Sequence, residues 1–337
     1  MNKIAIVSTS RADFSYLREF SKRLRWPGQK AFYFPDHVSR DQSNQSFLQR
    51  PYAHPPSGFF DGGTVDELSN YHLVCLLGDR FEALILAVLL DQKGVDLCHL
   101  NGGDTSLGSR DETYRKCLTL LAKYHLPFSI EGKSKILDLG IESCQIQVLD
   151  DLIDSQLASR IPIHSPQIIN PISKQVVCAY HPNTLTPGAT AQEMQILEKV
   201  LKNLSDYNFI WSYPNMDHGN DSVIELLRHY ESKYQNVSIM HPSDEDKFLQ
   251  VCMNSMCVIG NSSAGIIELP RLNIPCLNIG DRQKGRYYGL EVKHCSFDSD
   301  SISDHVKKFE LNRSFRTIPV KFFGKKFSPI RLSFLDD

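Results

Sequence analysis

Short apolar runs alternate with amphipathic segments along most of the chain. In the first half, the apolar runs lie at residues 4–8, 31–34, 72–77 and 95–100, and helical spacing of apolar residues follows at 14–24, 81–91 and 112–124. A strand, a polar turn and a helix repeated at this length predict βαβ units around a parallel sheet. The polar, proline-containing segment 39–66 has no period and is expected to be irregular.

The alternation stops at residues 160–176, which contain three prolines and no helical period, and then restarts. The second half has strand-like runs at 176–180, 207–213, 237–240 and 256–260, and helical patterns at 191–203, 222–230, 244–253 and 263–270. For a chain of 337 residues this pattern predicts α/β architecture with two doubly wound Rossmann-like domains, 1–165 and 166–337. We expect them to face one another across a ligand-binding cleft, and the last helix could pack back on the first domain.

Composition narrows the possible partners. Apolar residues make up 41% of the chain, charged residues 23%, and the net charge is −2, so no basic surface is expected for nucleic acid or anionic membranes. The nine cysteines are scattered and form no C-x-x-C pair, which predicts buried reduced thiols instead of a zinc site or a disulfide framework. With no signal peptide and no apolar run of about 20 residues, a cytoplasmic protein is expected.

The stretch CHLNGGDTSLGSRDE, residues 98–112, leaves an apolar strand for a glycine-rich loop with several acids. Two interpretations fit it. Asp111 can cap the helix that follows, so that the stretch is only a turn and a helix start. Alternatively, Asp104 and Asp111 belong to an acid–base site, and Asn101 then stands out among the acids. The stretch LGDRFEAL, residues 77–84, has the same ambiguity, because Asp79 and Glu82 resemble a capping box while Asp79 also suits a catalytic acid.

The stretch GNSSAGIIELP, residues 260–270, follows a predicted strand and opens a helical pattern. Small residues at a helix N-terminus present free N–H groups that favour a phosphate, and Glu268 lies about one turn further on, within reach of a ribose. The alternative is that Asn261 or Ser262 is simply an N-cap.

Other candidate side chains also follow predicted strands: Arg11, His181, Asn215 and Arg282. Arg11 could bind a diphosphate bidentately, and the loop GDRQKGR, residues 280–286, suits a flexible basic lip over an anion, although a solvated turn explains it equally well. Each motif is weak by itself. Their common position matters more, because open α/β sheets bind ligands at the carboxyl ends of their strands.

Taken in order, these motifs resemble the UDP-N-acetylglucosamine 2-epimerases, specifically the hydrolysing branch of sialic-acid-type sugar pathways. The resemblance spans about residues 3–295 and rests on Thr9-Ser10-Arg11-Ala12-Asp13, Gly78-Asp79-Arg80-Phe81-Glu82, His99-x-x-Gly102-Gly103-Asp104, Asp111-Glu112, His181-Pro182, Tyr213-Pro214-Asn215, Asn261-Ser262-Ser263-Ala264-Gly265-Ile266-Ile267-Glu268 and Gly280-Asp281-Arg282-Gln283. It implies a fold like that of the GT-B glycosyltransferases, with the active site in the interdomain cleft.

The resemblance also implies a reaction. Hydrolysing members remove the sugar C2 proton, eliminate UDP, and add water to the glycal to release N-acetylmannosamine for sialic-acid-like nonulosonate or surface polysaccharide synthesis. They use no metal and no redox cofactor, and we expect a homo-oligomer, a dimer or a tetramer. The implied catalytic residues are Asp79, Asp104, Asp111 and His181. The implied substrate-binding residues are Arg11, Asn101, Arg115, Asn215, Asn261, Ser262, Ser263, Gly265, Glu268 and Arg282.

The sequence departs from the family pattern at the opening loop. Many hydrolysing members have a catalytic glutamate at the position of Asn101, and an amide cannot transfer a proton in that way. The second acid of that pattern survives as Asp104, and an Arg-His pair appears here as Arg115-Lys116. Three hypotheses therefore stay open: a hydrolysing 2-epimerase of a UDP- or GDP-linked N-acetylhexosamine, a glycosyltransferase on the same frame, and a non-catalytic nucleotide-sugar-binding homologue.

Overall fold

The computed structural model describes residues 3–9, 11–33, 62–161, 168–215, 219–240, 245–286, 292–323 and 325–335. The chain forms two compact units. Unit 1 consists of Met1–Asp104, Asp111–Ser159 and Lys326–Asp337, and unit 2 of Thr105–Arg110 and Arg160–Lys325. Each unit is described by itself below.

Unit 1 is built on a sheet of five parallel strands in the order β2-β1-β3-β4-β5. The strands are β1 Ile4–Ser8, β2 Lys30–Tyr33, β3 Leu73–Leu77, β4 Asp96–Leu100 and β5 Tyr124–Leu126. Every residue of β1 and β3 is buried, as expected for central strands covered on both faces. The strand order reverses between β1 and β3, so a ligand crevice is expected at the carboxyl ends of these strands.

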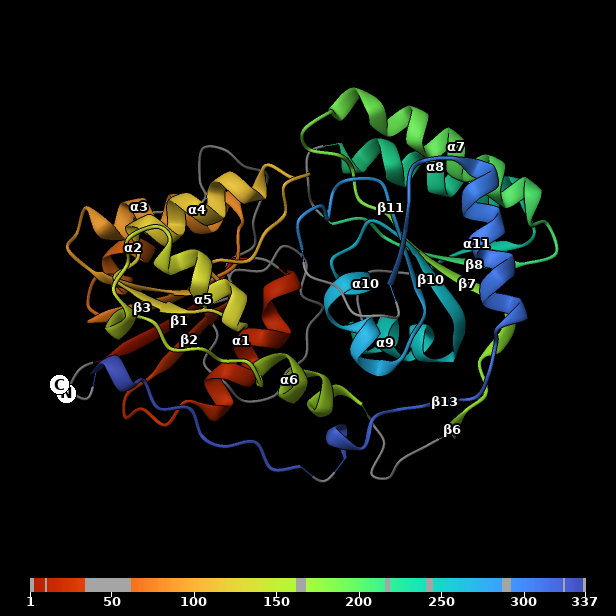
Figure 1. The fold of residues 1–337 in the computed structure, drawn as a ribbon. Helices are drawn as coiled ribbons and strands as arrows, with labels where there is room; N and C mark the ends of the chain where they lie inside the picture. Colours follow the sequence, from red (N-terminus) through yellow and green to blue (C-terminus); the bar gives the residue numbers. More distant parts are fainter. Residues whose placement is uncertain are drawn as a thin grey trace. The chain divides into compact units, whose positions relative to one another are not determined.

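The helices of unit 1 are α1 Arg11–Arg23, α2 Gly62–Leu68, α3 Phe81–Asp91, α4 Asp111–Leu121, α5 Ile130–Leu137 and α6 Leu152–Arg160. Helices α2, α3 and α4 cover one face of the sheet (Figure 1), where Leu68, Leu86 and Leu118 join the strand side chains in one core cluster. The C-terminal segment 326–335 also belongs to this unit, since the Ile330 amide donates to the Arg23 carbonyl at 2.8 Å.

Unit 2 is built on a sheet of six parallel strands in the order β12-β11-β10-β7-β8-β9. The strands are β7 Ile172–Ala179, β8 Asn208–Ser212, β9 Val237–Met240, β10 Ser255–Gly260, β11 Cys276–Ile279 and β12 Val292–Cys295, and a separate antiparallel pair joins β6 Ile168–Ile169 to β13 Arg316–Thr317. The order reverses between β7 and β10, which places the expected crevice of this unit at their carboxyl ends.

The helices of unit 2 are α7 Thr190–Asn203, α8 Asn220–Lys233, α9 Glu245–Asn254, α10 Ala264–Ile267 and α11 Ser299–Leu311. Helices α7, α8 and α11 pack on one face of the sheet over the buried Trp211, and α9 and α10 lie on the other face (Figure 1). Two doubly wound parallel sheets confirm the predicted α/β class with two Rossmann-like domains.

Three details of the sequence prediction need correction or completion. The helix expected over 112–124 ends at Leu121, because the Lys123 amide leaves the helix and donates to the Leu97 carbonyl at 3.0 Å as β5 begins. Residues 39–61 of the segment expected to be irregular lie outside the described residues, whereas Gly62–Leu68 forms α2 because Val65 and Leu68 pack into the core. Helices α5, α6 and α11 and strands β5, β11 and β12 were not predicted.

Three further properties concern the described ranges as a whole. None of the helices in them is long and apolar enough to cross a bilayer. In the same ranges, no three His, Cys, Asp or Glu side chains gather into a group that could hold a metal ion. All nine cysteines are described; none forms a disulfide, and only Cys117 and Cys144 are exposed.

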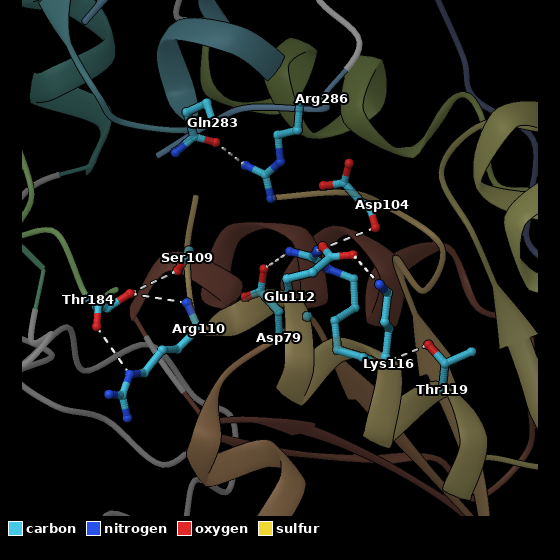
Figure 2. Close-up of polar contacts among 12 residues, drawn as sticks. Asp79, Asp104, Ser109, Arg110, Glu112, Lys116, Thr119, Thr184, Gln283 and Arg286 are labelled. Carbon is cyan, nitrogen blue, oxygen red and sulfur yellow. Dashed lines mark hydrogen bonds and ion pairs between the residues drawn. The ribbon is translucent and has the colours of Figure 1, made fainter. Parts of the chain in front are cut away.

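Residues 105–110 pack on unit 2 although both of their flanks belong to unit 1. The Leu107 amide donates to the Lys284 carbonyl at 2.9 Å. Arg110 is held by Thr184, whose hydroxyl accepts from the Arg110 amide and whose carbonyl accepts from Arg110 Nε, both at 3.1 Å (Figure 2). The segment is therefore an integral part of unit 2.

Replacing Gly108 by alanine is expected to destabilise unit 2 by about 1–3 kcal/mol, because the new Cβ would fall inside the van der Waals radius of the Asp281 carbonyl oxygen. Gly188 is a matched control in the same unit, since a Cβ there meets open space. Urea unfolding followed by the fluorescence of the buried Trp211 measures both variants. Equal midpoints for the two variants would show that residues 105–110 are not tightly packed.

Candidate functional site

Asp79 lies at the carboxyl end of the central strand β3. Gly78 makes the turn with a φ of +91°, and its amide donates to the Leu100 carbonyl at 3.1 Å. Helix α3 takes Arg80 as its N-cap, and the Arg80 side chain makes no capping hydrogen bond. The helix therefore begins one residue later than the capping-box interpretation of Asp79 and Glu82 requires, and the Asp79 carboxylate has an ion-pair partner on another helix.

That partner is Arg115, whose side chain is 1% exposed. One end of its guanidinium pairs with Asp79, and the other donates to Glu112 at 2.7 Å and to the Asp104 carbonyl at 3.3 Å. Glu112 also pairs with Lys116 at 3.1 Å (Figure 2 shows Asp79, Glu112 and Lys116 gathered here). Helix α4 thus brings a buried cation to the end of β3 and holds two carboxylates around it.

Electrostatics explains why this cation is tolerated inside the unit. Burial disfavours the charge of the Arg115 guanidinium, but Asp79, Asp104 and Glu112 outweigh that effect and raise its pKa. Sequence reasoning missed Glu112 as a site residue. Its signal was present, since Glu112, Arg115 and Lys116 have the i, i+3 and i, i+4 spacings that pair charges on one helix.

The turn after β4 has close steric constraints. Asn101 adopts a φ of +60°, and its amide donates to the Leu126 carbonyl at 3.0 Å. A Cβ on Gly102 would lie 2.9 Å from His99 Nδ1, and one on Gly103 would collide with the Gly132 carbonyl. Both glycines are thus required by packing within unit 1.

Replacing Asn101 by glutamate is expected to lower the free energy of unfolding by about 1 kcal/mol. Asparagine tolerates the left-handed conformation, whereas a longer side chain is strained there. Thermal and urea unfolding measure the loss. Asn101→Gly is the control and should be at least as stable as the glutamate variant, since glycine adopts a positive φ freely. The strain argument fails if the glutamate variant is the more stable of the two.

The other candidates of unit 1 lie on the same edge of its sheet. Asp104 follows the β4 turn and is partly buried, and its carbonyl accepts from Arg115. Asp111 is the first residue of α4, where a negative charge suits the helix dipole. Arg11 begins α1, but its side chain lies outside the described residues.

In unit 2, Asn261 connects the ends of β7 and β10. Its side-chain amide accepts from the His181 amide at 2.7 Å and donates to the His181 carbonyl at 2.8 Å. His181 Nδ1 accepts from the Asn215 amide at 3.0 Å, so a neutral His181 ring carries its proton on Nε2 and can donate there. The structure therefore links three predicted residues, His181, Asn215 and Asn261, by hydrogen bonds.

The loop after β10 differs from the expectation. The amides of Asn261 and Ser262 both donate to the Ala179 carbonyl, at 3.0 and 3.2 Å, so the prediction of free N–H groups is wrong for them. The N-cap of α10 is Ser263, which makes no capping bond, whereas the Ser262 hydroxyl accepts from the Ala264 amide at the start of the helix at 3.4 Å. The N-cap position is thus one residue later than predicted, while Ser262 still binds the first turn. Helix α10 has only four residues and ends at Ile267, with Glu268 as its C-cap, which limits any effect of its dipole.

The loop 280–286 is a turn that is packed on one side, since Arg282, Gln283 and Arg286 are buried while Asp281, Lys284 and Gly285 are exposed. Arg282, Gln283 and Arg286 are each less than 9% exposed. The Asn261 carbonyl accepts from Gln283 Nε2 at 2.8 Å and from Arg282 at 3.4 Å, and Arg286 donates to Gln283 at 2.8 Å (Figure 2 shows this last pair). This packing could not be predicted from the sequence, because it depends on the carbonyl of a residue about twenty positions earlier in the chain.

A buried tyrosine–carboxylate pair lies beside His181 and was also missed. The Tyr180 hydroxyl donates to Glu193 at 2.5 Å. Burial raises the pKa of Glu193. The hydrogen bonds that it accepts from Tyr180 and Asn183 lower the pKa but offset only part of the effect of burial. The pair anchors α7 to the end of β7, directly before His181.

Comparison with known proteins gives relatives along most of the chain. It is 29% identical over 241 residues to polysialic acid biosynthesis protein P7 of Escherichia coli, covering 69% of this chain and 61% of the relative. It is 29% identical over 244 residues to the hydrolysing GDP/UDP-N,N'-diacetylbacillosamine 2-epimerase of Campylobacter jejuni, and the match covers 71% of this chain and 62% of that relative. The matches thus span about three-fifths of the length of these two relatives.

Solved structures share the fold. The S. aureus MnaA–UDP structure superposes with a TM-score of 0.69 at 13% identity, covering 91% of this chain and 88% of that one. The structure of Methanocaldococcus jannaschii UDP-GlcNAc 2-epimerase with UDP-GlcNAc and UDP superposes with a TM-score of 0.68 at 14% identity, and the match covers 94% of each chain. The UDP-N-acetylglucosamine 2-epimerase family model matches residues 64–327, which include every candidate site residue except Arg11. By this match over most of its length, the chain belongs to the UDP-N-acetylglucosamine 2-epimerase family.

Proposed function

We propose that this protein is a hydrolysing 2-epimerase that converts UDP-N-acetylglucosamine, or a close relative of it, into UDP and the free 2-epimeric sugar. The observation that carries the proposal is the Asp79–Arg115–Glu112 cluster at the carboxyl end of the unit 1 sheet, in a chain of this family. The hydrolysing reaction in the name of the Campylobacter jejuni relative supports the choice of branch.

The chemistry needs a strong base and a stabilised leaving group. The C2 proton is very weakly acidic, and we assign its removal to Asp79, which Arg115 holds in an ion pair. The C1–O bond then breaks, and its electron pair leaves with UDP while the C1–C2 double bond of the glycal forms. Water adds its hydroxyl to C1, and Asp104 or Asp111 returns a proton to the opposite face of C2. No step of this reaction changes the overall oxidation state of the substrate.

We assign UDP to unit 2. Ser262, Ser263 and Gly265 are the proposed diphosphate ligands and Glu268 the ribose ligand. The two serines would bind through their hydroxyls, whereas Gly265 has only its backbone amide, which donates to the Ser262 carbonyl at 3.2 Å here. His181 would donate from Nε2 to the leaving diphosphate, which stabilises the charge that develops there. Arg11, Asn215 and Arg282 remain proposed substrate contacts.

Two predicted ligands receive a different proposed role. The amide of Asn261 is occupied on both sides by the His181 backbone, so we propose that it orients His181. Arg115 is occupied by two carboxylates and a carbonyl, so we propose that it holds the bases and does not bind the sugar. Asn101 is left as a substrate contact without a proton-transfer role, because an amide does not titrate.

The finer parts of the proposal concern context. We place the reaction in the cytoplasm, in the synthesis of sialic-acid-like nonulosonates or surface polysaccharides, and we propose a dimer or tetramer in solution. The relatives named for polysialic acid and for diacetylbacillosamine support this sugar class. Size-exclusion chromatography with light scattering measures the oligomer directly.

The test is incubation of the purified protein with UDP-N-acetylglucosamine, a UDP-diacetamido-trideoxyhexose and their GDP counterparts in D₂O. We expect free UDP together with a free 2-epimeric sugar that carries one deuterium at C2. Release of an intact UDP-linked epimer would instead indicate a non-hydrolysing epimerase. Transfer to an acceptor without deuterium would indicate a glycosyltransferase, and UDP binding without turnover a non-catalytic homologue; each of these three results contradicts the proposal.

A further inference from the structure

His99 contacts the backbone of the residue before Asp79 and the side chain of a residue one turn after Arg115. On β4, its fully buried ring places Nε2 2.7 Å from the Gly78 carbonyl, the residue before Asp79. Its Nδ1 is 3.0 Å from the hydroxyl of Thr119 on α4. That hydroxyl also lies 2.9 Å from the Arg115 carbonyl, one turn earlier in the helix.

The two hydrogen-bond partners of the His99 ring determine its tautomer. A carbonyl only accepts, so the contact with Gly78 requires a proton on Nε2. Burial lowers the pKa of His99 to about 3, so the ring is neutral at physiological pH and Nδ1 is an acceptor for the Thr119 hydroxyl. The single hydroxyl proton of Thr119 is then shared between His99 and the Arg115 carbonyl.

Both polar groups of the Gly78 backbone are thereby held by β4. The amide, in the peptide before Gly78, donates to the Leu100 carbonyl, and the carbonyl, in the peptide that leads into Asp79, accepts from His99, so each of the two peptide planes is held by one hydrogen bond. The neighbouring turn is close to the ring, since a Cβ on Gly102 would lie 2.9 Å from Nδ1. A single imidazole therefore connects the end of β3 to α4, the two elements that carry the ion pair.

We propose that His99, acting with Thr119, is a positioning residue that sets the geometry of the Asp79–Arg115 pair for proton transfer. The role rests on the proposed function, in which Asp79 is the base. A base displaced by a fraction of an ångström loses rate without loss of nucleotide affinity, because small misplacements of reacting groups are costly. His99 itself, fully buried, transfers no proton in this proposal.

The first test is the matched pair Thr119→Val and Thr119→Ser. Valine keeps the shape of this 1% exposed residue but removes the hydroxyl, and serine keeps the hydroxyl. We expect Thr119→Val to lower kcat about tenfold with KM within twofold of wild type, and Thr119→Ser to restore kcat. His99→Asn keeps an acceptor near the Nδ1 position and loses the Gly78 bond; we expect about a hundredfold loss of kcat. Wild-type kcat in Thr119→Val, or a change confined to KM, overturns the proposal.

A second readout does not depend on turnover. The Arg115 Nε–H resonance of ¹⁵N-labelled protein should be observable because this side chain is buried. We expect Thr119→Val to shift it and Thr119→Ser to leave it in place. If the wild-type protein releases no UDP from any nucleotide sugar, the proposed function fails, and this resonance still decides whether the network positions Arg115. An unmoved resonance in Thr119→Val overturns the positioning role by itself.

Discussion

Replacing Arg115 by methionine is expected to lower the free energy of unfolding by about 3–5 kcal/mol, the range for removing one partner of a buried ion pair. Methionine fills the space of this 1% exposed side chain but leaves Asp79 and Glu112 without their shared counter-charge. Arg115→Lys should recover only part of the loss, since an ammonium group cannot bond two carboxylates and the Asp104 carbonyl with the fork of a guanidinium.

Urea unfolding at pH 7.5 measures this effect. Arg18→Met is the control, because Arg18 is exposed on α1 and a surface change of this kind stays within about 0.5 kcal/mol. A loss in Arg115→Met no larger than that of the control would show that the cluster is not a buried ion pair.

Replacing Asp79 by asparagine is expected to lower the rate of UDP release by about 10²–10⁴, the usual contribution of a positioned general base. Asparagine keeps the shape and can still accept from Arg115, so the fold should persist while proton abstraction stops. UDP affinity, measured by isothermal titration calorimetry, should stay within twofold of wild type because UDP is assigned to unit 2.

The matched control is Asp96→Asn. Asp96 is half-exposed at the start of β4 and pairs with Lys123 at 2.6 Å, so it resembles Asp79 in charge and pairing but lies at the opposite end of the sheet. It should turn over at the wild-type rate. If Asp79→Asn retains more than about a tenth of the wild-type rate, the base is another residue.

Most of the fold could be predicted from the sequence because its central strands are continuous apolar runs that end at glycine or polar residues. Strand β3 and helix α3 lie almost where the pattern of 72–77 and 81–91 predicts. Strand β5 was missed because three residues give no usable period, and its place beside β4 is decided by long-range pairing of His99 with His125. Local pattern cannot report a partner of that kind.

The candidate site was predicted residue by residue, but its connections were not. The motif search selected Asp79, Arg115 and Asn261, yet it did not show that Arg115 pairs with Asp79 across 36 positions or that Asn261 binds the His181 backbone across 80. The capping-box signal at Asp79 was misleading, because the positive φ of Gly78 changes where α3 begins. Sequence spacing identifies chemistry within one helix, whereas tertiary hydrogen bonds decide which polar groups remain available to a ligand.

The membership of residues 105–110 in unit 2 has a consequence for protein engineering. The chain passes between the two units at four places, after Asp104, Arg110, Ser159 and Lys325. A gene fragment that ends at Ser159 would therefore carry residues 105–110 without their packing partners and would lack the segment 326–335. Chimeras made by a single crossover between relatives would mismatch both segments. Exchange of one unit as a module requires these two short pieces to be exchanged together with the unit on which they pack.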